Sequence, residues 1–236
     1  MGGANRPFSA NLQIASSTDV INLRTLADQA GYDGAANTEI YFGILPDVFL
    51  YAGITTGNWP AGKEHNLVLN VHGKLYGQSG IGGAAAYNDL GISGWNGNGN
   101  PGSPGGDAIY ASAPLTVNII STGEVIGGGG GGGGGAGWGG MSTGPEPEYS
   151  FGSGGTGGNG FPFQTAGNPK QDVGAGNGGT GGGPAAVGAS GAVATKVGAS
   201  YTKFSPGIGG AAGWAIRKNG QLVTVNNVGV ITGTVA

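Results

Sequence analysis

The chain has 236 residues, only 9% of them charged, with a formal charge of −3. This balance gives no electrostatic footprint for nucleic-acid binding, and the lack of cysteine excludes a disulfide framework and thiolate chemistry. No stretch approaches the ~20 apolar residues of a membrane span, and no apolar core follows the first residues as in a signal peptide. Of the 58 glycines, 46 lie in residues 77–213. This distribution predicts three domains, 1–76, 77–213 and 214–236.

The first part, 1–76, predicts a small β-rich module with one short helix. Asn22 is well placed as the N-cap of a helix over 23–30, and Gly31 is a natural residue to end it. Apolar residues on one face of this helix allow it to cover a modest core. Further strands are expected at 39–42, 48–52 and 66–75.

A strand-forming phrase recurs three times along the chain. It starts at Asn70, at Asn118 and at Asn226, and each copy alternates apolar and polar residues before reaching glycine. Because repeated units bury their faces against one another, the repetition predicts stacked, similar strands. Residues 214–236 are accordingly expected to be closing strands that pack on the glycine-rich part.

Nine consecutive glycines, 127–135, dominate the middle of the chain. Such a run is either a flexible linker or an extended threefold helix held by backbone hydrogen bonds to similar neighbours, the polyglycine II form. Other glycine-rich segments, such as 152–160 and 174–183, supply partners for its backbone groups. We therefore expect a mostly β and irregular fold in which a bundle of polyglycine II helices with interleaved strands follows the N-terminal module.

The connections between the glycine segments collect the large side chains. Rigid aromatic residues on a stiff scaffold are typical of a recognition surface, although the same residues could fold back to cover the segment ends. The candidate binding residues are Tyr87, Trp95, Trp138, Met141, Tyr149, Phe151, Phe161, Phe163, Tyr201 and Phe204.

Motifs for catalysis and for metal or cofactor binding are not legible. The two glycine–lysine pairs are not followed by Ser or Thr, as a phosphate-binding loop requires. His65 and His72, seven residues apart on a candidate strand, face opposite sides and do not suggest a shared metal. The carboxylates of Glu146 and Glu148 flank a proline in a loop without an indicated pocket. We expect neither an enzyme nor a cofactor.

The combination of these features resembles the receptor-binding tips of tailed bacteriophages. The stretches "NLRTLADQAGYDG" at 22–34 and "VNIISTGEVIGGGGGGGGG" at 117–135, together with the aromatic connections, carry the resemblance. They are similar to the glycine-rich C-terminal region of lambda-like central tail-fibre proteins and to the distal adhesins of T-even-like long tail fibres. The resemblance implies a virion protein outside the host cell, whose loops bind a bacterial outer-membrane protein or glycan.

The same resemblance implies the rest of the tail fibre as a partner, and leaves open whether the chain is a homotrimer or a single chain capping a fibre. Two other functions compete with that of a fibre-tip adhesin. An ice-binding or purely structural protein would show regular tripeptides with a flat Ala/Thr face. A glycan depolymerase would shorten host polysaccharide.

Overall fold

The chain forms two compact units. The structure is a computed structural model of residues 1–236 and describes residues 6–86, 97–141, 149–195 and 201–236. The first unit, here the solenoid unit, comprises Met1–Gly77, Asp107–Gly127 and Trp214–Ala236. The second, the glycine-rich unit, comprises Gln78–Gly106 and Gly128–Gly213.

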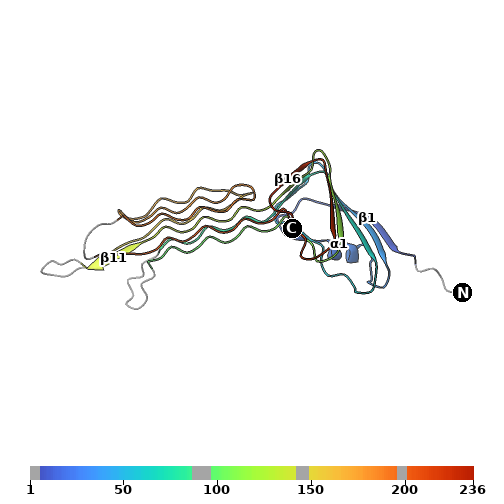
Figure 1. Cartoon of the computed structure of the whole chain (residues 1–236), viewed down its shortest axis with the longest axis horizontal. Coiled ribbons are helices and arrows are strands. Elements are labelled where there is room, and N and C mark those ends of the chain that lie inside the picture. The colour runs from blue at the N-terminus through green and yellow to red at the C-terminus, as the bar shows by residue number, and fades with distance from the viewer. Residues whose placement is uncertain (1–5, 87–96, 142–148, 196–200) are drawn as a thin grey trace. The chain divides into compact units, whose positions relative to one another are not determined.

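Three parallel sheets make up the solenoid unit (Figure 1). The first sheet consists of β1 (Phe8–Ile14), β3 (Thr38–Ile44), β6 (His65–Val71), β9 (Leu115–Ile119) and β15 (Val223–Asn227). The second consists of β4 (Phe49–Leu50), β7 (Lys74–Tyr76), β10 (Glu124–Ile126) and β16 (Val230–Thr232). The third consists of β2 (Ile21–Asn22), β5 (Ile54–Thr55), β8 (Ile109–Tyr110) and β14 (Ile216–Arg217).

The chain visits the three sheets in turn, so that each circuit stacks on the one before it. Strands β3, β4 and β5 form one such circuit, and the next strands along the chain pair with them in parallel. Inward-facing residues of all three sheets, among them Phe42, Leu75 and Ile109, are fully buried in one core. This arrangement is a three-sided parallel β-solenoid, in which each circuit buries its apolar face against its neighbours.

The recurring strand phrase is what sets the register of this stack. Asn70 of β6 lies opposite Asn118 of β9, and Asn118 lies opposite Asn226 of β15. The predicted stacking of the three copies is therefore confirmed. The structure differs from the predicted division of the chain at residues 107–127, which form β8–β10 of the solenoid unit. Likewise β14–β16, within 214–236, pair with strands of this unit, because their alternating apolar residues complete its core.

The single helix in the described ranges, α1 (Leu23–Gln29), lies where the sequence predicts it. The Asn22 side-chain oxygen accepts hydrogen bonds from the backbone N–H groups of Arg24 and Thr25, at 3.0 and 3.3 Å. Gly31 ends the helix with a φ of +99°, in the left-handed region that favours glycine. Within the described residues, no helix has both the length and the hydropathy of a membrane span.

The cap at Asn22 gives a testable contribution to stability. Replacing Asn22 by Ala leaves two helix N–H groups without their acceptor, so we expect a loss of about 1 kcal/mol in the free energy of unfolding. Urea denaturation followed by circular dichroism measures this loss. Asn22→Asp keeps an acceptor oxygen and should retain most of the stability. Equal urea midpoints for Asn22→Ala and the unchanged protein would contradict the assigned cap.

In the described part of the glycine-rich unit, extended segments run side by side (Figure 1) and exchange backbone hydrogen bonds. The central segment, 127–137, contains the nine glycines and hydrogen-bonds to six other described segments. These are 77–86, 97–106, 155–161, 176–183, 186–195 and 207–213. Neighbouring members of the six also bond to each other and close a ring around the central segment, while 165–173 lies outside this ring.

Hydrogen bonds along the central segment repeat every three residues. The N–H groups of Gly129, Gly132 and Gly135 donate to one neighbour, at the carbonyls of Phe161, Gly158 and Gly155. The N–H groups of Gly130 and Gly133 donate to a second neighbour, segment 186–195. Those of Gly131 and Gly134 donate to a third, segment 97–106. A buried backbone without side chains is thus fully paired, which is the requirement for removing it from water.

Glycine is required in the central segment because its neighbours approach so closely. A Cβ atom placed on any of residues 128–135 would overlap backbone atoms of a surrounding segment, most often a carbonyl oxygen. At Gly131 that atom is the carbonyl oxygen of Ile81. The sequence favoured a packed segment over a flexible linker, and the structure confirms that the run lies in a packed interior.

Candidate functional site

One end of the glycine-rich unit, here the outer end, gathers three connections of the chain. The central segment runs from Gly128 to this end, where Gly135 accepts a hydrogen bond from Ala86 and Gly137 donates one to Gly97. The connections 87–96, 142–148 and 196–200 all leave from and return to described residues at this end.

A small antiparallel sheet forms the outer end. It consists of β11 (Trp138–Met141) between β12 (Tyr149–Gly152) and β13 (Tyr201–Lys203). Met141 lies opposite Tyr149, Gly139 lies opposite both Phe151 and Thr202, and Gly140 lies opposite Tyr201. The fold thereby brings five sequence-predicted site residues, from three separate parts of the chain, onto one sheet: Trp138, Met141, Tyr149, Phe151 and Tyr201.

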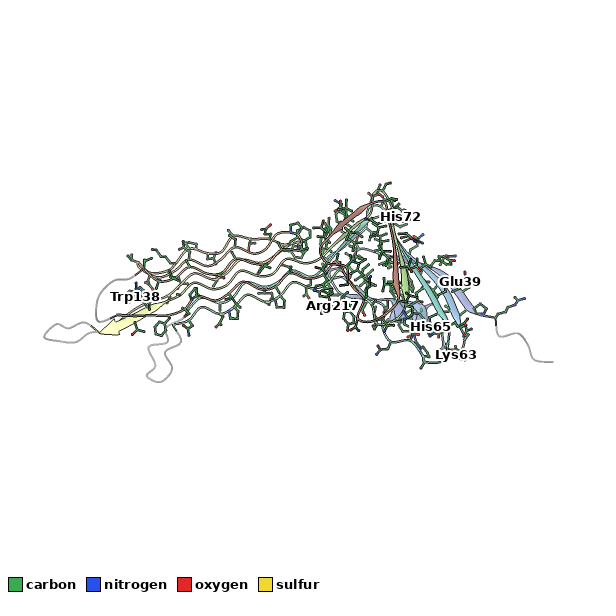
Figure 2. The ribbon with its side chains drawn as sticks, in the orientation of Figure 1. Glu39, Lys63, His65, His72, Trp138 and Arg217 are labelled. Atoms are coloured by element: carbon green, nitrogen blue, oxygen red, sulfur yellow. The ribbon has the colours of Figure 1, made fainter. Side chains whose placement is uncertain are left out.

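Trp138 is at the outer end but does not face solvent (Figure 2). Only 7% of it is exposed, and it packs with Ala136, Ala175 and Ala194. Its indole Nε1–H donates to the carbonyl of Val173 at 3.1 Å. Trp138 thus packs against the ends of the extended segments instead of presenting its ring to solvent, and its predicted part in a binding surface stays a prediction.

Phe204 occupies an intermediate position at the same end. Its backbone N–H donates to the carbonyl of Gly137 at 3.2 Å, and its side chain is half-buried. The ring lies directly against Gly97, where an added Cβ would overlap it. Phe204 is therefore fixed to the scaffold with part of its surface still accessible.

The aromatic residues Phe161 and Phe163 lie at the opposite, inner end of the glycine-rich unit. The carbonyl of Phe161 accepts a hydrogen bond from Gly129, near the start of the central segment, and its N–H donates to Gly182. Phe163 is 53% exposed. The sequence gave no means of separating these two residues from the others, because proline- and aromatic-rich connections look alike at both ends. Tyr87 and Trp95 lie outside the described residues.

Charge is sparse throughout the described glycine-rich unit. Its ionisable side chains are Lys170, Asp172 and Lys203 in the ranges that the structure describes. Asp172 accepts a hydrogen bond from the backbone N–H of Ser153 at 2.7 Å, which ties the segments together at this place.

Two titratable groups of the solenoid unit, His65 and Tyr76, are engaged in structural contacts. His65 bonds through Nδ1 to the Thr38 hydroxyl and through Nε2 to the carbonyl of Pro60, at 3.1 and 2.9 Å. Burial, together with a hydrogen bond to Glu124, raises the pKa of Tyr76, so this phenol stays protonated and donates. Across the described part of the chain, no three His, Asp or Glu side chains gather closely enough to hold a metal ion.

Comparison with known proteins identifies the class that this fold and this end belong to. The chain belongs to the family described as phage tail fibre adhesin Gp38, whose model matches residues 9–236. It is also similar in fold to the crystal structure of the gp37–gp38 adhesin tip complex of the bacteriophage S16 long tail fibre, with a TM-score of 0.53 and 21% identity. That match covers 98% of this chain and 83% of the other. No curated protein matches the chain.

The chain is therefore a bacteriophage tail fibre tip adhesin, a component of the virion tail that acts outside the host cell in host recognition. The family is one of binding proteins, in agreement with the non-enzymatic reading of the sequence. The prediction of a fibre-tip adhesin, made from the resemblance to phage receptor-binding tips, is confirmed.

Proposed function

We propose that this adhesin contacts its receptor on the bacterial surface through the outer end of the glycine-rich unit. The observation that carries the proposal is that the residues flanking three chain connections meet there: those of 142–148 and 196–200 on one small sheet, and those of 87–96 beside the end of the central segment. The contact residues among the sequence-predicted set are then Tyr87, Trp95, Met141, Tyr149, Phe151, Tyr201 and Phe204. In this proposal Trp138 stabilises the sheet that carries them through its buried packing. Phe161 and Phe163, at the other end of the unit, do not contact the receptor.

The extended segments that carry this end are, in our proposal, polyglycine II helices. A helix of this type has three residues per turn and a rise of about 3.1 Å per residue. The three-residue period of the hydrogen bonds around the central segment favours this form, since each third residue then faces the same neighbour. A rod of this kind holds its ends rigidly while the residues in the connections vary, because the packing uses backbone atoms.

A receptor that suits this surface is an outer-membrane protein or an uncharged portion of a surface glycan. The connections 87–96, 142–148 and 196–200 carry three acidic residues and one lysine, a balance that disfavours a strongly anionic glycan. Aromatic side chains bury a large area on contact at a small cost in conformational entropy, which makes them common anchors of binding surfaces.

The solenoid unit, in turn, would attach the adhesin to the tail fibre. The similar structure from phage S16 is a complex of two different chains, gp37 and gp38. Among the strands that the structure describes, β1 is an edge strand of the first sheet, and its inward residues Phe8, Ala10 and Leu12 are only partly buried. An apolar end of this kind fits a fibre protein better than open solvent. The homotrimer considered from the sequence is the alternative assembly.

Replacement of connections tests the receptor-binding proposal. We expect that exchanging 142–148 or 196–200 for Gly/Ser linkers of equal length lowers adsorption to host cells at least roughly tenfold, as loss of a binding hot spot does. Adsorption of fluorescently labelled protein to cells measures this, and circular dichroism shows whether folding is kept. Phe163→Ser, at the inner end, is the control and should adsorb normally. Unchanged adsorption after exchange of both connections and of 87–96 would refute the proposal.

A further inference from the structure

A ladder of asparagine side chains crosses the outward face of the first sheet of the solenoid unit. The Nδ2 group of Asn226 donates to Oδ1 of Asn118 at 2.9 Å, and Nδ2 of Asn118 donates to Oδ1 of Asn70 at 2.8 Å. All these bonds run in one direction across the sheet. The ladder therefore ends at Asn70 with an Nδ2 group that has no hydrogen-bond partner in the described residues. Chains of amides bonded in one direction polarise one another, which strengthens this terminal donor.

The next strand interrupts the ladder with a glycine. Gly43 of β3 lies opposite Asn70, and on its other side it lies opposite Gln13 of β1. Gly43 has no positive φ, and an added Cβ would meet nothing within 4 Å. Neither backbone conformation nor packing therefore requires glycine at this strand position, where a residue with a side chain would be more favourable. A glycine of this kind often marks a place where a ligand approaches the backbone.

A hollow of about 230 Å³ opens over this glycine. Gln13 and Asn70 line it on either side of Gly43, and Tyr41 and Leu45 line it along the strand. The side chains of Tyr41 and Leu45 are 36% and 42% exposed. The hollow thus has amide groups on two sides and an aromatic and an aliphatic side chain on the others, and Asn11 and His72 complete its polar lining.

We infer that this hollow binds the acetamido group of an N-acetylated sugar. Neighbouring strands lie about 4.8 Å apart, so the strands of Gln13 and Asn70 are separated by roughly 9.6 Å, the space of one missing amide in the ladder. The acetamido carbonyl accepts from Asn70 Nδ2, and its N–H donates to Oε1 of Gln13. The methyl group then packs on Leu45, while the sugar ring lies against Tyr41.

An uncharged sugar fits the surroundings of the hollow. The hydroxyl of Tyr41 donates to a carboxylate oxygen of Glu39 at 3.0 Å, which keeps a negative charge beside the aromatic wall and disfavours acidic sugars. A primary amide from a protein side chain offers the same hydrogen bonds but lacks the methyl group. This site is independent of the contacts proposed for the outer end, so a failure here leaves that proposal untouched.

Filling the gap in the ladder tests the inference. Titration of the full chain with N,N′-diacetylchitobiose, followed by NMR of side-chain amides, should shift the Asn70 resonances, whereas cellobiose, which lacks acetamido groups, should not. Gly43→Asn places an amide in the gap and should abolish the chitobiose shifts while keeping the thermal stability. Asn226→Ala, at the far end of the ladder, removes an amide outside the hollow and should retain binding.

Each other outcome overturns the inference. Equal responses to chitobiose and cellobiose would show that the acetamido group is not recognised. Binding by Gly43→Asn at the original affinity would place the sugar elsewhere. If chitobiose causes no shifts but a short peptide containing Asn does, the hollow binds the primary amide of a protein side chain instead.

Discussion

Gly131→Val should unfold the glycine-rich unit or reduce its stability by about 3 kcal/mol or more. The new Cβ would overlap the carbonyl of Ile81, in a segment whose own backbone is fixed by hydrogen bonds. Overpacking in a core usually costs about 1–3 kcal/mol because side chains move aside, but here the obstructing atoms are backbone. Differential scanning calorimetry measures the effect, which at this chain length is roughly 6–12 °C in the melting temperature for 3 kcal/mol.

The matched control is the same substitution at Gly183, in the same unit. A Cβ on Gly183 would meet nothing within 4 Å, and its φ is not positive. Gly183→Val should therefore melt close to the unchanged protein. Comparable melting temperatures for Gly131→Val and Gly183→Val would mean that the central glycines are not packed as described.

Trp138→Ala should destabilise the outer end and, through it, reduce adsorption to host cells. Removing a buried tryptophan leaves a cavity among Ala136, Ala175 and Ala194 and an unpaired carbonyl at Val173. Such truncations cost about 3–5 kcal/mol. Since β11 begins at Trp138, the strands that carry Met141, Tyr149 and Tyr201 should lose their fixed positions. Thermal melting and cell adsorption should fall together.

Trp138→Phe separates packing from direct contact. It retains most of the buried area and loses the hydrogen bond to Val173, a cost of about 1 kcal/mol, so adsorption should be largely kept. A Trp138→Ala protein that melts normally but no longer adsorbs would show instead that the indole itself touches the receptor.

Local chemistry made several features of the fold predictable. The sequence predicts both ends of α1. The hydrogen bonds of the Asn22 cap and the left-handed backbone of Gly31 depend only on residues close to them in the chain. The repeated phrases at Asn70, Asn118 and Asn226 predicted stacked strands, since equivalent residues of similar strands fall into register. The closure of these strands into three sheets was not predictable from the same phrases, because the strands of the second and third sheets have only two or three residues each.

The aromatic connections show where local information ends. Trp138 and Phe163 each follow a glycine segment, yet one is buried and the other is more than half exposed. The difference depends on Val173, Ala175 and Ala194, which reach Trp138 only after the chain has reversed direction several times. The residues next to Trp138 and Phe163 in the sequence give no indication of these long-range contacts.

By itself, the sequence determined that the chain would be a charge-poor adhesin with a β-rich part and packed glycine segments. The adhesin class follows from the resemblance to phage fibre tips. The packed glycine segments follow from composition, because residues without side chains can be buried only by pairing backbone with backbone. Tertiary structure alone decided that 107–127 belongs to the solenoid unit and which connections share the outer end. Both depend on hydrogen bonds between segments far apart in the chain, and glycine segments are too alike for the sequence to specify which of them pair.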